Sequence, residues 1–186
     1  MIIDDLRLMK AQRLARVEPR LCFVRVSIPE LLERVRQDLF PEERHSLKFY
    51  FVRRGPLACI CPGETAATIY VHEVLNLSET PAEVMSAICK HELLHLVIPA
   101  RAVNNRMTNH PPEFWVRERK IAPERYAAWE WVWMNVGDCL RPRPRLERID
   151  VTSRWKAERR LKMTAREHWD WLESRRRLSM ADSGGW

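Results

Sequence analysis

The sequence predicts an α+β fold in which a small three-stranded sheet, antiparallel or mixed, packs on one central helix. Apolar and polar residues alternate between residues 47 and 74, which is typical of strands. A mostly apolar helix pattern follows over 80–98, and most of the chain beyond it is helical in pattern. We therefore expect one domain over residues 1–140 and a basic, Trp- and Arg-rich helical extension over 141–186.

The elements expected before the central helix follow one another in short steps. Leucine and valine side chains at helical spacing predict a helix over 27–39. An alternating run over 47–53 predicts a strand, and an Arg-Gly-Pro turn lets residues 57–61 return as its antiparallel partner. Residues 66–74 predict a third strand.

The central helix has signals at both of its ends. Thr80 is expected to accept a hydrogen bond from the amide of Glu83 while the Glu83 side chain reaches back, and Pro81 suits the first helical position. Pro99 disfavours the α conformation of the residue before it, so we expect the helix to end at Ile98.

The second half of this helix contains the sequence His-Glu-Leu-Leu-His over residues 91–95. His91 and His95, four residues apart, project from one face on adjacent turns and can share one metal ion. Glu92 is placed beside them to take a proton from a metal-bound water. Burying these three ionisable groups among apolar residues is costly unless a divalent cation compensates them. The alternative is a chance match to the motif on a core helix.

A third protein ligand is needed for a catalytic zinc site, and the sequence offers two candidates. A polar stretch over 100–109, expected to be a loop, lets the chain fold back and deliver His110. A Pro-Pro-Glu helix start over 111–113 follows it directly. Glu113 is the rival ligand and would make the site His/His/Glu, while His110 would then be a plain histidine at a helix start.

The two histidine-bearing segments together closely resemble the SprT-like metallopeptidase domain. That family has H-E-x-x-H, a loop, and then H-G-P-E-F, against H-E-L-L-H and N-H-P-P-E-F-W in this chain. The resemblance covers roughly residues 30–120 and implies a zincin-like α+β domain that hydrolyses peptide bonds. It implies Zn²⁺ held by His91, His95 and His110, with Glu92 as the catalytic base.

The resemblance also has differences and open points. Pro111 stands where the family has glycine, and no cysteine quartet follows for the zinc ribbon of many members. The related YgjP-like metallopeptidases have a similar H-E-L-x-H and N-H-S-x-x-F-W, so the subfamily stays open. By analogy with zincins, a protein or peptide substrate would lie along residues 66–74 as the sheet edge. His72 would then line the cleft or be a surface histidine. Tyr126 and nearby arginines are candidates for stabilising the oxyanion.

Beyond the motif, tryptophans and arginines dominate the chain. A helix starting at Pro123-Glu124 is expected to pack through one stripe, and a stiff basic linker is expected over 141–145. Further helices are expected over 4–16, 152–162 and 164–178. The stripe consists of Tyr126, Trp129, Trp133 and Val136, with Trp131 off it.

The positive charge of the chain belongs to its C-terminal piece. Residues 141–178 carry 13 Lys or Arg against 6 Asp or Glu, whereas residues 1–140 carry 19 against 18. Trp155, Trp169 and Trp171 among these arginines indicate DNA or another nucleic acid as a partner of 141–178, with DNA-associated proteins as substrates. The alternative is a solvated arginine face with the tryptophans docked on the protein. The alternatives to a peptidase are a nucleic-acid-binding protein with structural zinc and an interaction module without turnover. Glu92 argues against both, because a structural zinc site needs no carboxylate beside its first ligand.

The cysteines, the apolar runs and the N-terminus indicate in which cellular compartment the protein is expected. The five cysteines form no paired C-x-x-C knuckles, no apolar run approaches membrane-spanning length, and the acidic N-terminus shows no signal peptide. We therefore expect a cytoplasmic protein with reduced cysteines and no membrane partner.

Overall fold

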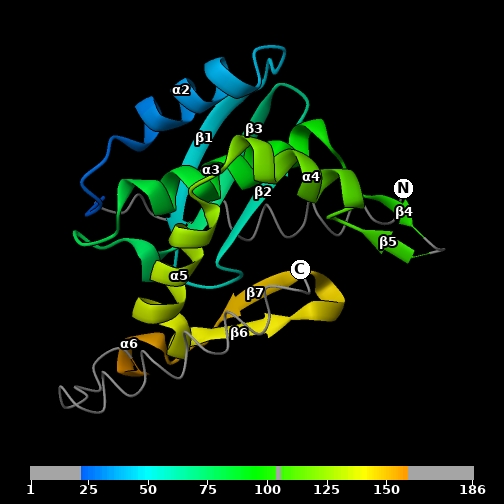
Figure 1. The fold of residues 1–186 in the computed structure, drawn as a ribbon. Helices are drawn as coiled ribbons and strands as arrows, with labels where there is room; N and C mark the ends of the chain where they lie inside the picture. Colours follow the sequence, from blue (N-terminus) through cyan, green and yellow to red (C-terminus); the bar gives the residue numbers. More distant parts are fainter. Residues whose placement is uncertain (1–21, 104–105, 159–186) are drawn as a thin grey trace.

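A computed structural model describes residues 22–103 and 106–158 of the chain (Figure 1). The elements alternate between helices and short strands, with one long helix in the middle of the sequence. In chain order they are α2 (Ile28–Leu39), β1 (Ser46–Val52), β2 (Ala58–Pro62), β3 (Ala66–His72), the 3-10 turn η1 (Glu73–Leu75), α3 (Ala82–Val97), β4 (Arg101–Val103), β5 (Arg106–Thr108), α4 (Pro112–Ile121), α5 (Arg125–Val136), η2 (Gly137–Cys139), β6 (Leu140–Arg143), η3 (Pro144–Leu146), β7 (Arg148–Val151) and α6 (Trp155–Glu158).

The three-stranded sheet is mixed, with the order β1-β3-β2, so the predicted α+β class with a small mixed sheet is confirmed. β1 runs parallel to β3, and β2 runs antiparallel to it. The expectation that residues 57–61 pair with the first strand is therefore wrong. β3 is almost continuously buried, whereas exposure alternates along most of β1. A strand covered on both faces belongs at the centre of a sheet, and this is the place that β3 takes.

Helix α3 lies at the centre of the packing and contacts α2, α4, α5 and β2 (Figure 1). Because it is covered on several sides, it buries apolar residues around most of its circumference rather than along one stripe. The buried residues are Val84, Met85, Ala87, Ile88, Cys89, Glu92, Leu93 and Leu94. The motif predicted on this helix is therefore held by a helix that packs into the core.

The start of α3 differs from the predicted capping box. The helix begins at Ala82 after Pro81, and no side chain caps it. The hydroxyl of Thr80 instead donates to the carbonyl of Leu75 at 2.8 Å, which ties the helix start to the preceding 3-10 turn. The helix ends at Val97 with Ile98 as its C-terminal cap, close to the predicted end.

Two segments that were predicted to be irregular form β-hairpins. Residues 100–109 contain β4 paired with β5, so the expected polar loop is wrong there. Residues 141–145 are part of β6 and η3 rather than a linker, because β6 pairs with β7. The amide of Leu57 donates to the carbonyl of Ile149 at 2.7 Å, which joins the second hairpin to the sheet. Ile149 and Val151 are partly buried against the core. Their apolar packing stabilises the hairpin even though Pro142 and Pro144 lie in it.

The C-terminal part of the described chain also packs into the core. α6 begins at Trp155, whose side chain is 8% exposed, and is described as far as Glu158 within the helix expected over 152–162. The helices expected over 4–16 and 164–178 lie outside the described residues. The division of the chain at residue 140 stays a prediction. No helix in the described ranges has the length and apolar character to cross a membrane.

Helix α5 packs through Trp129, Trp133 and Val136 as predicted, but Tyr126 and Trp131 differ from the prediction. Tyr126 is 62% exposed, and the buried residues are Ala128, Val132 and Val136. Trp129, Trp131 and Trp133 are all partly buried against the core, so Trp131 is not off the packing face. Helix α5 packs against α3, and the three tryptophans add to this packing as partly buried side chains.

Candidate metal centre

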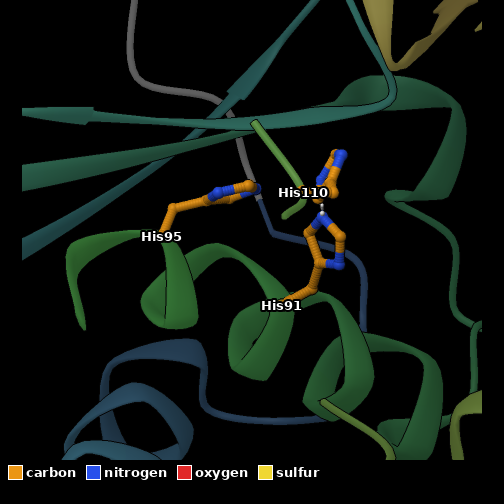
Figure 2. Close-up of side chains that lie close together, drawn as sticks. All are labelled: His91, His95 and His110. Carbon is orange, nitrogen blue, oxygen red and sulfur yellow. Dashed lines mark hydrogen bonds between the residues drawn. The ribbon is translucent and has the colours of Figure 1, made fainter. Parts of the chain in front are cut away.

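Three histidines predicted as ligands meet at one point above helix α3 (Figure 2). His91 and His95 project from adjacent turns of α3, and His110 comes from the short segment between β5 and α4. One ring nitrogen from each residue lies within 4.8 Å of those of the other two. The Nε2 atoms of His91 and His110 are 3.1 Å apart.

The donor set suits a zinc ion. Two nitrogen ligands at 2.0–2.1 Å in a tetrahedral site lie about 3.3 Å from each other, close to the spacing of the two Nε2 atoms. The ring of Phe114 forms an apolar floor, with its centroid 5.0, 4.6 and 4.8 Å from the rings of His91, His95 and His110. Three imidazoles converge on one point above an apolar floor, and this arrangement fits a metal better than three protonated rings.

His91 is oriented by a buried carboxylate from α4. Its Nδ1 lies 2.6 Å from Oε1 of Glu118, whose side chain is 2% exposed and is also 2.8 Å from Nε of Arg125. Burial opposes the ionisation of Glu118, but the hydrogen bond from His91 and the charge of Arg125 lower its pKa overall. An Nδ1–H donated to Glu118 leaves the Nε2 lone pair facing the other histidines, which is the arrangement of metal-binding histidines.

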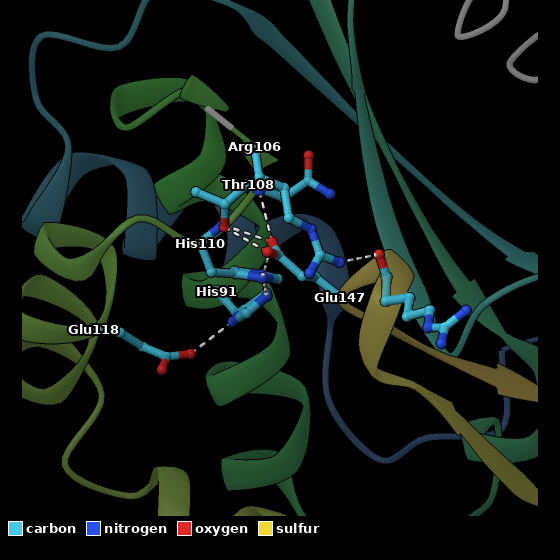
Figure 3. Close-up of polar contacts among 8 residues, drawn as sticks. His91, Arg106, Thr108, His110, Glu118 and Glu147 are labelled. Carbon is cyan, nitrogen blue, oxygen red and sulfur yellow. Dashed lines mark hydrogen bonds and ion pairs between the residues drawn. The ribbon is translucent and has the colours of Figure 1, made fainter. Parts of the chain in front are cut away.

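His110 is held by a second carboxylate, that of Glu147, which comes from the turn of the β6–β7 hairpin (Figure 3). Oε2 of Glu147 accepts the amides of Asn109 and His110 at 2.6 and 3.1 Å and lies 3.4 Å from Nδ1 of His110. Its Oε1 accepts the hydroxyl of Thr108 at 2.5 Å. Burial and the nearby His91 lower the pKa of His110 to about 4, so its ring is neutral at physiological pH.

The backbone of Glu147 is left-handed, with φ 49° and ψ 45°. A residue with a Cβ pays roughly 1–2 kcal/mol for this conformation, and glycine avoids most of that cost. Sequence reasoning did not find Glu147 or Glu118, which lie 37 and 27 residues from the histidines they contact. No local pattern marks either residue.

Glu92 lies on the same helix and is 5% exposed. Burial raises the pKa of its carboxyl to about 7, although the charge of His91 and a hydrogen bond from the Ile60 backbone act in the opposite direction. A carboxyl with a pKa near 7 can both accept and return a proton at neutral pH.

The rival ligand Glu113 is not brought to the three histidines. Its carboxylate lies 2.6 Å from a guanidinium nitrogen of Arg101, and the Glu113 side chain is 39% exposed. Within the described part of the chain, the histidines form the one group of three or more residues with metal-binding geometry, and Glu113 is not a member.

His72 is neither in a cleft nor on the surface, so both predictions for it are wrong. It is fully buried, its Nδ1 accepts the amide of Val74 at 3.1 Å, and its Nε2 lies 2.9 Å from the carbonyl of Arg53. Its ring packs edge-on against Trp155 at 5.5 Å. Burial lowers the pKa of His72 to about 4, which keeps this structural histidine neutral.

The fold changes the sheet edge expected to bind substrate and leaves the role of Tyr126 untested. β3 is the central strand, so it cannot offer the sheet edge predicted for residues 66–74, and β2 forms the edge that packs near α3. The exposed ring of Tyr126 contacts the guanidinium of Arg125 at 5.4 Å. Tyr126 stays an untested candidate for stabilising the oxyanion.

Comparisons with models of known protein families, with curated proteins and with solved structures gave no match.

Proposed function

We propose that this protein is a zinc-dependent metallopeptidase of zincin-like fold, with His91, His95 and His110 holding the zinc and Glu92 as general base. The observation that carries the proposal is the convergence of three imidazoles beside a buried carboxyl whose pKa is about 7. The outer carboxylate that orients His91 adds support, because metal-binding histidines almost always donate their second N–H in this way.

The chemistry divides between the metal and this chain's own residues. A bound zinc ion supplies a lowered pKa for water and polarisation of the scissile carbonyl. Glu92 accepts a proton from the attacking water as its oxygen bonds to the carbonyl carbon, and returns the proton to the amine nitrogen as the C–N bond breaks. The buried position of Glu92 keeps its carboxyl basic enough for the first transfer.

The substrate proposed for this site is an extended protein or peptide segment. β2 is an edge strand, and a peptide can add to such an edge through main-chain hydrogen bonds. The Ile60 backbone, near the middle of β2, hydrogen-bonds to Glu92, so this edge runs past the proposed base. Strand addition at β2 would therefore carry a scissile bond toward Glu92.

A nucleic-acid partner for residues 141–178 and a cytoplasmic location stay predictions. Several of the described arginines are neutralised within the protein. Arg143 and Arg148 pair with Asp150, and Arg141 lies 3.8 Å from Glu158. Seven of the 13 basic residues lie beyond residue 158, outside the described residues.

The test of the proposal is the variant Glu92→Gln. We expect it to retain one zinc per chain while the cleavage of a panel of unfolded proteins falls by roughly 10²- to 10⁴-fold, because only the base is lost. Glu113→Gln is the matched control, since it neutralises an exposed carboxylate away from the histidines. Near wild-type turnover in Glu92→Gln would exclude this residue as the base. A zinc-loaded wild type that cleaves nothing in the panel would favour the interaction module.

A further inference from the structure

We infer that Glu147 is a positioning residue that pins the segment 108–110, so that the third histidine reaches the two on α3. The inference rests on the proposed metal centre and assigns part of its assembly to the β6–β7 hairpin. Figure 3 shows the carboxylate of Glu147 facing this segment from the turn of that hairpin.

The contacts of Glu147 are concentrated on three consecutive residues. Its two carboxylate oxygens accept the Thr108 hydroxyl and the amides of Asn109 and His110, at 2.5, 2.6 and 3.1 Å. Thr108 is the last residue of β5, and Asn109 and His110 lie between that strand and the start of α4. A charged acceptor that takes two successive amides holds such a segment in one conformation.

A second contact supports the same pairing of the two hairpins. The guanidinium of Arg106 donates to the carbonyl of Arg145 at 2.8 Å, next to the contacts of Glu147. The β4–β5 hairpin is thus joined to the turn of the β6–β7 hairpin through both Arg145 and Glu147. His110 depends on this joint, because it enters the site from the end of β5.

The backbone of Glu147 points to a role for its side chain. Glycine or asparagine suits a left-handed turn position better than glutamate does. Glu147 nevertheless occupies the left-handed position, and its carboxylate is 25% exposed and bonded to the histidine segment. The conformation of the turn does not favour glutamate at position 147. The hydrogen bonds to residues 108–110 do require its carboxylate.

The variant Glu147→Gly separates these two roles, because glycine relieves the turn while removing the carboxylate. We expect the metal-free variant to remain folded, because relief of the turn offsets part of the stability lost with the three hydrogen bonds. We expect the amides of Asn109 and His110 to exchange about tenfold faster, since each loses its acceptor. We expect its affinity for Zn²⁺ to fall by roughly 10- to 100-fold, the usual effect of losing an outer-shell partner.

Two more variants serve as an intermediate case and as a control. Glu147→Gln keeps the turn and an acceptor oxygen but loses the charge, so it should lie between the wild type and Glu147→Gly in both readouts. Glu113→Ala removes an exposed carboxylate that pairs with Arg101 and should change neither readout.

The outcomes distinguish this inference from the proposed function. Faster amide exchange together with weaker zinc binding supports the positioning role. Unchanged exchange, or unchanged zinc affinity in a wild type that binds zinc, overturns it and leaves the metal centre standing. A wild type that binds no Zn²⁺ overturns the metal centre itself, and the metal role of Glu147 falls with it.

Discussion

The two helix histidines and the third histidine are held by different kinds of interaction. His91 and His95 belong to one long helix whose neighbouring residues are buried, so their spacing is fixed by backbone hydrogen bonds and apolar packing. His110 lies on a short segment between two elements and is held by a carboxylate from a hairpin 37 residues away. The pair is therefore preformed with the core, whereas the third ligand depends on polar contacts between two hairpins.

Removing ligands from the two sides tests this difference most strongly. His110→Ala leaves His91 and His95 in place. We expect its zinc affinity to fall by about 100-fold or more, because one protein ligand contributes roughly 3 kcal/mol to the free energy of zinc binding. The measurement is a Zn²⁺ titration against a competing chelator. His95→Ala should lose at least as much.

Glu113→Ala is the control for the ligand assignment. Its carboxylate is engaged by Arg101 and lies outside the histidine group, so its zinc affinity should match the wild type. If the metal is lost with Glu113 and kept without His110, the assignment of the third ligand is wrong.

His72 is a buried histidine outside the metal site, so its pKa shows the effect of burial without that of a metal. Burial lowers the pKa of His72 to about 4, and protonation would place a proton against the amide of Val74. The unfolded chain binds this proton from about pH 6.5 downward, so stability is full above pH 6.5 and falls as the pH drops toward 4. The total loss is about 3 kcal/mol.

The check is chemical denaturation of the metal-free protein at pH 7 and pH 4. In His72→Gln, which keeps one donor and one acceptor, the loss of stability between these two pH values should be about 3 kcal/mol smaller than in the wild type. Equal pH dependence in the two proteins would show that His72 titrates normally in the folded state.

The same difference between local and distant interactions decides what the sequence could predict. The spacing of His91 and His95 and the Pro-Pro start of α4 are local signals, and both predicted the observed structure. The central place of β3 depends on which strand is buried on both faces, which alternation alone does not reveal. Strands of three residues, such as β4 and β5, are too short to show a period. The carboxylates that orient the site come from distant segments, so no motif contains them.

The smallest expected effect concerns Glu118, the carboxylate that orients His91 within the rigid part of the site. Glu118→Gln removes the charge beside Nδ1 of His91, and we expect zinc affinity to fall by roughly 10- to 100-fold, or about 1.4–2.7 kcal/mol. Arg125→Gln is the matched control, because both variants break the ion pair between α4 and α5 while only the first disturbs His91. Arg125→Gln should bind zinc as the wild type does, although both variants unfold more easily. If the two variants weaken zinc binding equally, Glu118 acts through the packing of α4 against α5 rather than through His91. The helix histidines would then depend on their surroundings in the same way that His110 does.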